Sequence, residues 1–103
     1  MKITLSFSRI VAGNTEEMGN LNFDEGDYYD IYNHMVLDKG FKDNPEKINR
    51  QAGFRIISIS SDGVLLEKIA SPVCTEYLTI RSKVELDFSY YGIYTITLIS
   101  LDA

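Results

Sequence analysis

The order of apolar and polar residues along the chain predicts several β-strands. Residues 2–11 alternate between apolar side chains, such as Leu5 and Phe7, and small polar ones. A period of two that uses β-branched and aromatic residues is typical of a strand with one face in water. The polar residues 14–23 show no such period, and we expect them to form a loop.

The second half of the chain predicts antiparallel strands joined by short turns. Phe54–Ser60 and Val64–Ile69 flank Asp62-Gly63, which is a strong hairpin signal because a tight turn of this type needs positive φ angles. The alternation then continues from residue 77 to residue 90, which is long for one strand, so we expect a bend or bulge near Ser82. Residues 93–101 are apolar on both sides, which predicts a central strand.

Residues 25–39 fit either a helix or a strand. As a helix, their apolar side chains fall on one arc, at the spacing of Tyr28, Ile31 and Met35. Asp24 can cap the first turn, and a glycine at position 40 is the usual stop. These end signals favour a helix over residues 25–39, although the tyrosines and β-branched residues favour a strand.

These elements predict an α+β fold. We expect a twisted antiparallel sheet of about five strands, with the amphipathic helix of residues 25–39 packed on it. A second, shorter helix is expected from Asn44-Pro45 to Gln51. The alternative is a mostly-β sandwich in which residues 28–37 form a strand. The 103 residues are enough for a single domain with one core.

Residues 78–96 are similar to the end of an immunoglobulin-like domain. Leu78-Thr79-Ile80 resembles one strand of that sandwich, and residues 90–96 resemble its tyrosine corner. Tyr94 stands two places before the position that cysteine often occupies, which is Ile96 here. The partner cysteine and core tryptophan of that family are missing from the chain. The resemblance covers about a fifth of the chain and implies a β-sandwich, without implying a function.

The charge of the chain is acidic and uneven. The net charge is −5 and the isoelectric point is near 4.7. Residues 16–46 hold nine acidic residues against only Lys39 and Lys42. Nucleic acids and anionic membranes are bound mainly through Lys and Arg, so neither is an expected partner. The acidic segment predicts a basic protein partner instead.

The N-terminal residues and the cysteine content predict a cytoplasmic protein. Residues 1–10 lack the continuous apolar stretch of a secretory signal, and the single cysteine, Cys74, cannot form an internal disulfide. Cys74 is expected to be a small buried residue, because its nearest charged neighbour, Glu76, disfavours a thiolate.

The sequence offers little for catalysis or for metal binding. His34 is the only histidine, and on the predicted helix it lies on the solvent face without a role. Asn20, Asn22 and Asp24 resemble the start of a calcium loop, but Glu25 stands where an EF-hand needs glycine. We therefore predict a non-enzymatic protein without a metal or a cofactor.

The most distinctive feature of the sequence is its acidic, tyrosine-rich segment between residues 16 and 32. Clustered carboxylates can steer a basic surface, and tyrosines are favoured at protein interfaces. The segment predicts an acidic inhibitor or immunity-type protein that docks on a basic, nucleic-acid-binding surface of a partner. The alternatives are a structural or assembly component, for which the sheet edges would bind, and a small-ligand-binding β domain. The predicted partner-binding residues are Glu25, Asp27, Tyr29 and Asp30.

Overall fold

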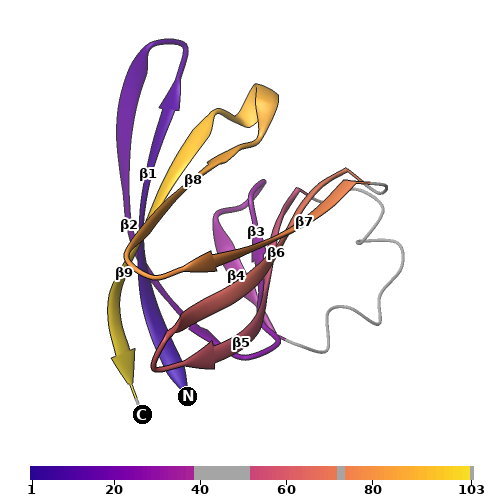
Figure 1. Cartoon of the computed structure of the whole chain (residues 1–103). Coiled ribbons are helices and arrows are strands. Elements are labelled where there is room, and N and C mark those ends of the chain that lie inside the picture. The colour runs from indigo at the N-terminus through magenta and orange to yellow at the C-terminus, as the bar shows by residue number, and fades with distance from the viewer. Residues whose placement is uncertain (39–51, 72–73, 103) are drawn as a thin grey trace.

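The computed structural model describes residues 1–38, 52–71 and 74–102, which fold into a sandwich of two antiparallel sheets (Figure 1). Sheet A has the strand order β2-β1-β9-β8, and sheet B has the order β4-β3-β5-β6-β7. The strands of sheet A are β1 (Lys2–Val11), β2 (Asn14–Asp24), β8 (Lys83–Asp87) and β9 (Ile93–Asp102). Those of sheet B are β3 (Tyr28–Asp30), β4 (Met35–Leu37), β5 (Gly53–Ser60), β6 (Gly63–Ser71) and β7 (Cys74–Ile80).

The predicted α+β fold is wrong, and the mostly-β alternative fits. Within residues 25–38, the chain forms β3, a turn and β4 in place of a helix. β3 and β4 pair antiparallel, with Tyr28 opposite Leu37 and Tyr29 opposite Val36. β3 also pairs with β5, so this segment belongs to sheet B. The second predicted helix, residues 44–51, lies outside the described residues.

Asp30 explains why a helix does not form. Its Oδ1 accepts a hydrogen bond from the backbone N–H of Tyr32 (3.0 Å), and its Oδ2 accepts one from Nδ2 of Asn33 (2.7 Å). Side chains that bond the backbone in this way stabilise turns at the expense of helices. His34 then takes a positive φ of 48°, which reverses the chain into β4. The helix-like spacing of apolar residues comes from two short strands and the turn between them.

Residues 14–23, expected to be a loop, belong to strand β2. This strand pairs with β1 from Asn14 opposite Val11 to Asp24 opposite Lys2. Met18 is an extra residue in the register, since Glu17 pairs with Ser8 and Gly19 pairs with Phe7. β2 is an edge strand with mostly exposed side chains, so the alternating pattern that marks half-buried strands is weak in it.

Several sequence predictions are confirmed. β1 covers the predicted residues 2–11, and β5 and β6 form the hairpin expected around Asp62-Gly63. The long alternating segment is divided into β7 and β8 by a bend at Arg81 and Ser82. β9 lies between β1 and β8, so it is a central strand as predicted. β7 lies in sheet B and β8 in sheet A, so the bend carries the chain from one sheet to the other.

The core lies between the two sheets and is rich in aromatic rings. Phe7 of sheet A stacks on Tyr29 of sheet B, with 4.6 Å between ring centroids, and Phe54 lies 6.1 Å from Phe7. Each of these three side chains is fully buried. Burying such large rings is the main source of stability in a domain of this size. The expected burial of Cys74 falls on a side chain outside the described part of the structure.

Candidate functional site

Glu25 and Asp27, two of the predicted partner-binding residues, lie in the turn between β2 and β3. The Glu25 side chain accepts a hydrogen bond from the backbone N–H of Ile59 (3.0 Å), next to the irregularity in β5. Asp27 Oδ2 accepts one from the backbone N–H of Asp24 (2.7 Å). Both carboxylates therefore shape the turn, and their predicted role in binding a partner stays a prediction.

Tyr29 and Asp30, the other two predicted contact residues, are buried. Tyr29 has no exposed surface and Asp30 is 3% exposed. The helix prediction put Tyr29 near an exposed edge, but in β3 its side chain points between the sheets. Neither side chain is available to a partner at the surface, so these two assignments are corrected here.

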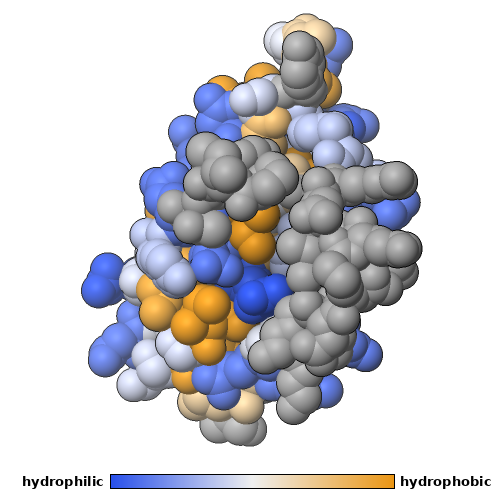
Figure 2. Space-filling model, turned by 90° about the vertical axis from the view of Figure 1, so that its right-hand side faces the viewer, coloured by the Kyte–Doolittle hydropathy of each residue, from blue (hydrophilic) through white to orange (hydrophobic). Residues whose placement is uncertain are grey.

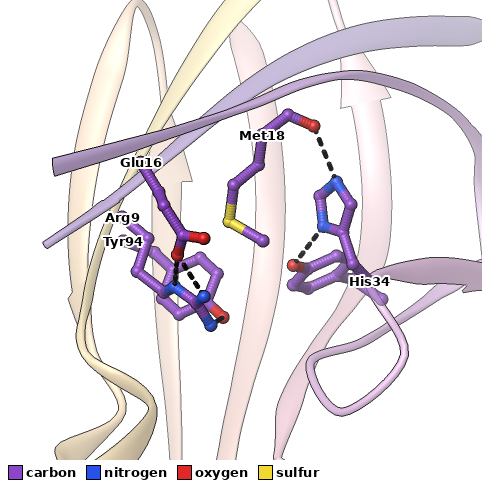
Figure 3. Close-up of polar contacts among 6 residues, drawn as sticks. Arg9, Glu16, Met18, His34 and Tyr94 are labelled. Atoms are coloured by element: carbon purple, nitrogen blue, oxygen red, sulfur yellow. Dashed lines mark hydrogen bonds and ion pairs between the residues drawn. The ribbon is translucent and has the colours of Figure 1, made fainter. Parts of the chain in front are cut away.

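His34 joins the two sheets, which corrects its expected exposure without a role. Its Nε2 lies 2.9 Å from the backbone carbonyl oxygen of Met18 in β2, and its Nδ1 lies 2.7 Å from Oη of Tyr29 (Figure 3). A carbonyl only accepts, so Nε2 carries the proton, and Nδ1 then accepts from the tyrosine hydroxyl. The imidazole also packs edge-on against Phe7, with 5.3 Å between centroids.

A second polar group lies beside His34, between β1, β2 and β9. The Arg9 guanidinium donates through Nε to Oε2 of Glu16 (2.8 Å), forms an ion pair with the same oxygen through Nη2, and donates through Nη1 to Oη of Tyr94 (3.3 Å). Glu16 raises the pKa of Arg9, and Tyr94 adds to this effect. Figure 3 shows the side chain of Met18 lying between this group and His34.

The two groups meet at Tyr29 and Tyr94. Their rings lie 6.3 Å apart in a T-shaped arrangement. Burial raises the pKa of Tyr29, and the electrostatic effect of neighbouring Tyr94 raises it further. We call the whole set the interior network: buried Tyr29 and Tyr94, half-buried Arg9 and His34, the Met18 carbonyl, and Glu16, which is the exposed outer end of the set. It connects three strands of sheet A to β3 and the β3–β4 turn of sheet B, and so it fixes how this end of the sandwich is held.

The raised pKa of Tyr29 makes the fold sensitive to alkaline pH. An unfolded tyrosine ionises near pH 10, whereas folded Tyr29 stays protonated at that pH, so unfolding releases a proton. The stabilisation is present below pH 10 and is lost as pH rises above it, by up to about 1.4 kcal/mol per pH unit for each such group. We expect Tyr29→Phe to flatten the fall in unfolding free energy measured by urea titration from pH 8 to 11. Equal slopes for the two proteins would contradict this.

Two tyrosines mark the surface above the interior network. Tyr32, in the β3–β4 turn, is 51% exposed, and its ring meets that of Tyr91 edge-on at 5.0 Å between centroids. Tyr91 ends the short 3-10 turn Ser89–Tyr91 that precedes β9. The pair therefore joins the connections of both sheets at one end of the sandwich. Met35, the next residue after His34 in the chain, is 44% exposed.

The outer face of sheet B carries a row of polar and aromatic residues. The register aligns Tyr28, Arg55, Glu67 and Tyr77 across four strands. On this side, apolar side chains gather beside hydrophilic ones (Figure 2). The same face holds a shallow depression of about 220 Å³, which is where the small-ligand alternative would place a ligand. Its lining residues are Ser58, Ser60, Asp62, Gly63, Leu65, Thr79 and Arg81.

The interior network could not be predicted from the sequence because its contacts are non-local. A lone histidine gave no signal, and its two partners are a backbone carbonyl sixteen residues away and a tyrosine assigned to a helix. The bulge at Met18 has only Gly19 as a local hint, since this glycine has a φ of 80°. Arg9 and Glu16 face each other across the β1–β2 hairpin, which the predicted loop concealed.

Comparison with known proteins adds no family. In the described part of the chain, no helix has the length and apolar character needed to cross a membrane. The similarity of residues 78–96 to an immunoglobulin-like domain stays a prediction, since no known family or structure supports it. A comparison with protein-family models, curated proteins and solved structures found no match to this chain.

Proposed function

We propose that this domain is a protein-binding module that acts as a structural or assembly component. The observation that carries the proposal is the Tyr32–Tyr91 pair, in which Tyr32 is exposed and Tyr91 is half-buried, and which joins the connections of both sheets at one end of the sandwich. Tyrosine side chains bury a large rigid area at little entropic cost, so they dominate many protein interfaces. Met35, three residues after Tyr32 in the chain, is also exposed and offers an adaptable apolar side chain.

The interior network supports this role because it holds the binding surface in one arrangement. Tyr32 lies two residues before His34, whose ring is fixed by Met18 and Tyr29. A surface that is ordered before binding loses less entropy when a partner docks. An assembly component fits these observations better than an acidic inhibitor does, since Tyr29 and Asp30 of the predicted acidic site are buried. The cytoplasmic location stays a prediction.

The proposal is tested by capturing partners with matched tyrosine variants. The immobilised chain and its Tyr32→Ala variant are exposed to extract of the native host, and the bound proteins are quantified by mass spectrometry. We expect Tyr32→Ala to reduce capture of the specific partner at least tenfold, because a central interface tyrosine is worth about 1.4 kcal/mol or more.

The control variant is Tyr77→Ala. Tyr77 is 62% exposed but lies on β7, in the row across sheet B rather than beside Tyr91. It should keep the partner that Tyr32→Ala loses. Retention of the same proteins at the same level by Tyr32→Ala would overturn the proposed surface.

A further inference from the structure

An exposed pair of isoleucines lies on the outer face of sheet A. Ile10 of β1 pairs with Ile93 of β9, and their neighbours Arg9 and Tyr94 point inward, so the isoleucines point out. Ile10 is 47% exposed and Ile93 is 41% exposed. In Figure 1, this face points away from sheet B. We call Ile10 and Ile93 the isoleucine pair.

Carboxylates surround the isoleucine pair on both edge strands. Asp87 of β8 pairs directly with Ile93. In the next row, Glu85 and Glu17 occupy the two ends, separated by Thr95 and Ser8. All three carboxylate residues are exposed, and we call them the acidic rim. Three strand spacings separate Glu17 from Glu85, which is roughly 14 Å.

The remaining groups on this face leave its charge negative. Lys83, two residues before Glu85 on β8, lies one row further from the isoleucine pair, opposite Thr97. Three acids against this one base leave a net charge of −2 around an apolar centre. Thr15, Ser8 and Thr95 fill the rest of the two rows and carry no charge.

We propose that the isoleucine pair and its acidic rim form a docking surface for a basic protein segment that presents an apolar side chain between lysines or arginines. This inference rests on the proposed function, since it names the chemistry of a protein partner. Basic side chains about 14 Å apart would meet Glu17 and Glu85, while the apolar side chain packs on Ile10 and Ile93. The acids speed the encounter and the isoleucines slow dissociation. Phosphate backbones and anionic lipids are repelled by the same rim.

The test uses the full chain and three synthetic peptides. One combines lysine with leucine in an amphipathic pattern, the second replaces leucine with serine, and the third replaces lysine with glutamate. Amide chemical shifts are followed by NMR during titration, in a series of salt concentrations. We expect the lysine–leucine peptide to shift residues around Ile10 and Ile93 and to bind at least fivefold more tightly than the other two.

Matched variants separate this surface from general acidic attraction. Ile93→Ser should weaken binding of the lysine–leucine peptide at least fivefold, whereas Ile99→Ser should leave it unchanged. Ile99 is 54% exposed in the same strand but at the other end of the sheet. Glu85→Gln with Asp87→Asn should weaken binding and flatten its salt dependence, whereas Asp62→Asn, in the β5–β6 turn, should not.

Two results would overturn the inference. One is equal binding of the lysine–leucine and lysine–serine peptides, which would mean attraction by charge alone. The other is an equal effect of Ile93→Ser and Ile99→Ser. If Tyr32→Ala loses the host partner while Ile93→Ser keeps both that partner and the peptide, the proposed function stands and this surface does not. If neither variant changes capture of any host protein, the proposed function fails as well.

Discussion

Replacing Gly53 with alanine is expected to destabilise the domain more than any other single methyl addition we describe. A β-carbon at this position would overlap the carbonyl oxygen of Tyr29 and lie 3.2 Å from Oη of Tyr28. The clash is with backbone, which cannot swing aside as a side chain can. β3 would have to separate from β5, and the Asp30–Gly53 pairing would be lost. We expect Gly53→Ala to lower the unfolding free energy by about 4 kcal/mol or more, measured by urea titration.

Gly13→Ala is the matched control for this prediction. Gly13 lies in the β1–β2 turn with a φ of 78°, and a β-carbon there would meet nothing within 4 Å. Its cost is the left-handed backbone alone, about 1 kcal/mol. If the two alanine variants lost the same stability, the close approach of β3 to β5 at Gly53 would not limit the choice of residue there.

The strands that were predicted correctly carry local signals in their own residues. β1 alternates without interruption from Ile3 to Phe7, and each apolar residue there is fully buried. Asp62-Gly63 indicates the β5–β6 hairpin from local sequence alone. In the structure the two loop residues are Ser61 and Asp62, and Gly63 opens β6 opposite Ser60. The bend near Ser82 could be predicted from the length of the alternating segment 77–90, since a strand that long must change sheets or twist.

The segments that were predicted wrongly depend on contacts from elsewhere in the chain. β2 exists because β1 lies beside it, and its own acids and asparagines favour a loop. β3 and β4 are three residues each, too short for a pattern to distinguish from one helical arc. Their conformation is decided by Asp30 in the turn and by pairing with β5. Tertiary pairing therefore overrides the helical end signals at Asp24 and Gly40.

The same reason limits what the sequence shows of binding surfaces. The acidic segment was visible in the composition of the chain, but the direction in which its side chains point depends on the sheet. In β3 the side chain of Tyr29 points into the core. Conversely, Ile10 and Ile93 are 83 positions apart in the chain and become neighbours only through the β1–β9 register. Composition predicts the charge of a partner, whereas the register decides which side chains it meets.

Replacing His34 with alanine is expected to open the contact between the sheets at the free edge of β2. The change leaves the Tyr29 hydroxyl and the Met18 carbonyl without their partner. It also removes a ring that packs edge-on against both Phe7 and Tyr29. Unsatisfied polar groups cost about 1–3 kcal/mol, and the lost packing adds to this. We expect a loss of about 3 kcal/mol in unfolding free energy, together with faster amide hydrogen exchange at Met18 and Gly19.

Asn33→Ala distinguishes this effect from a general weakening of the turn. Asn33 is exposed and contributes one hydrogen bond to Asp30, so its loss should cost about 1 kcal/mol and leave exchange at Met18 unchanged.

The contacts of the His34 ring also predict which imidazole nitrogen carries the proton. Because the chain has one histidine, a long-range proton–nitrogen NMR spectrum reports His34 alone. It should show hydrogen on Nε2 and none on Nδ1, as the contacts of the ring with Met18 and Tyr29 require. A proton on Nδ1, or a stability loss no larger than that of Asn33→Ala, would mean that His34 does not join the sheets.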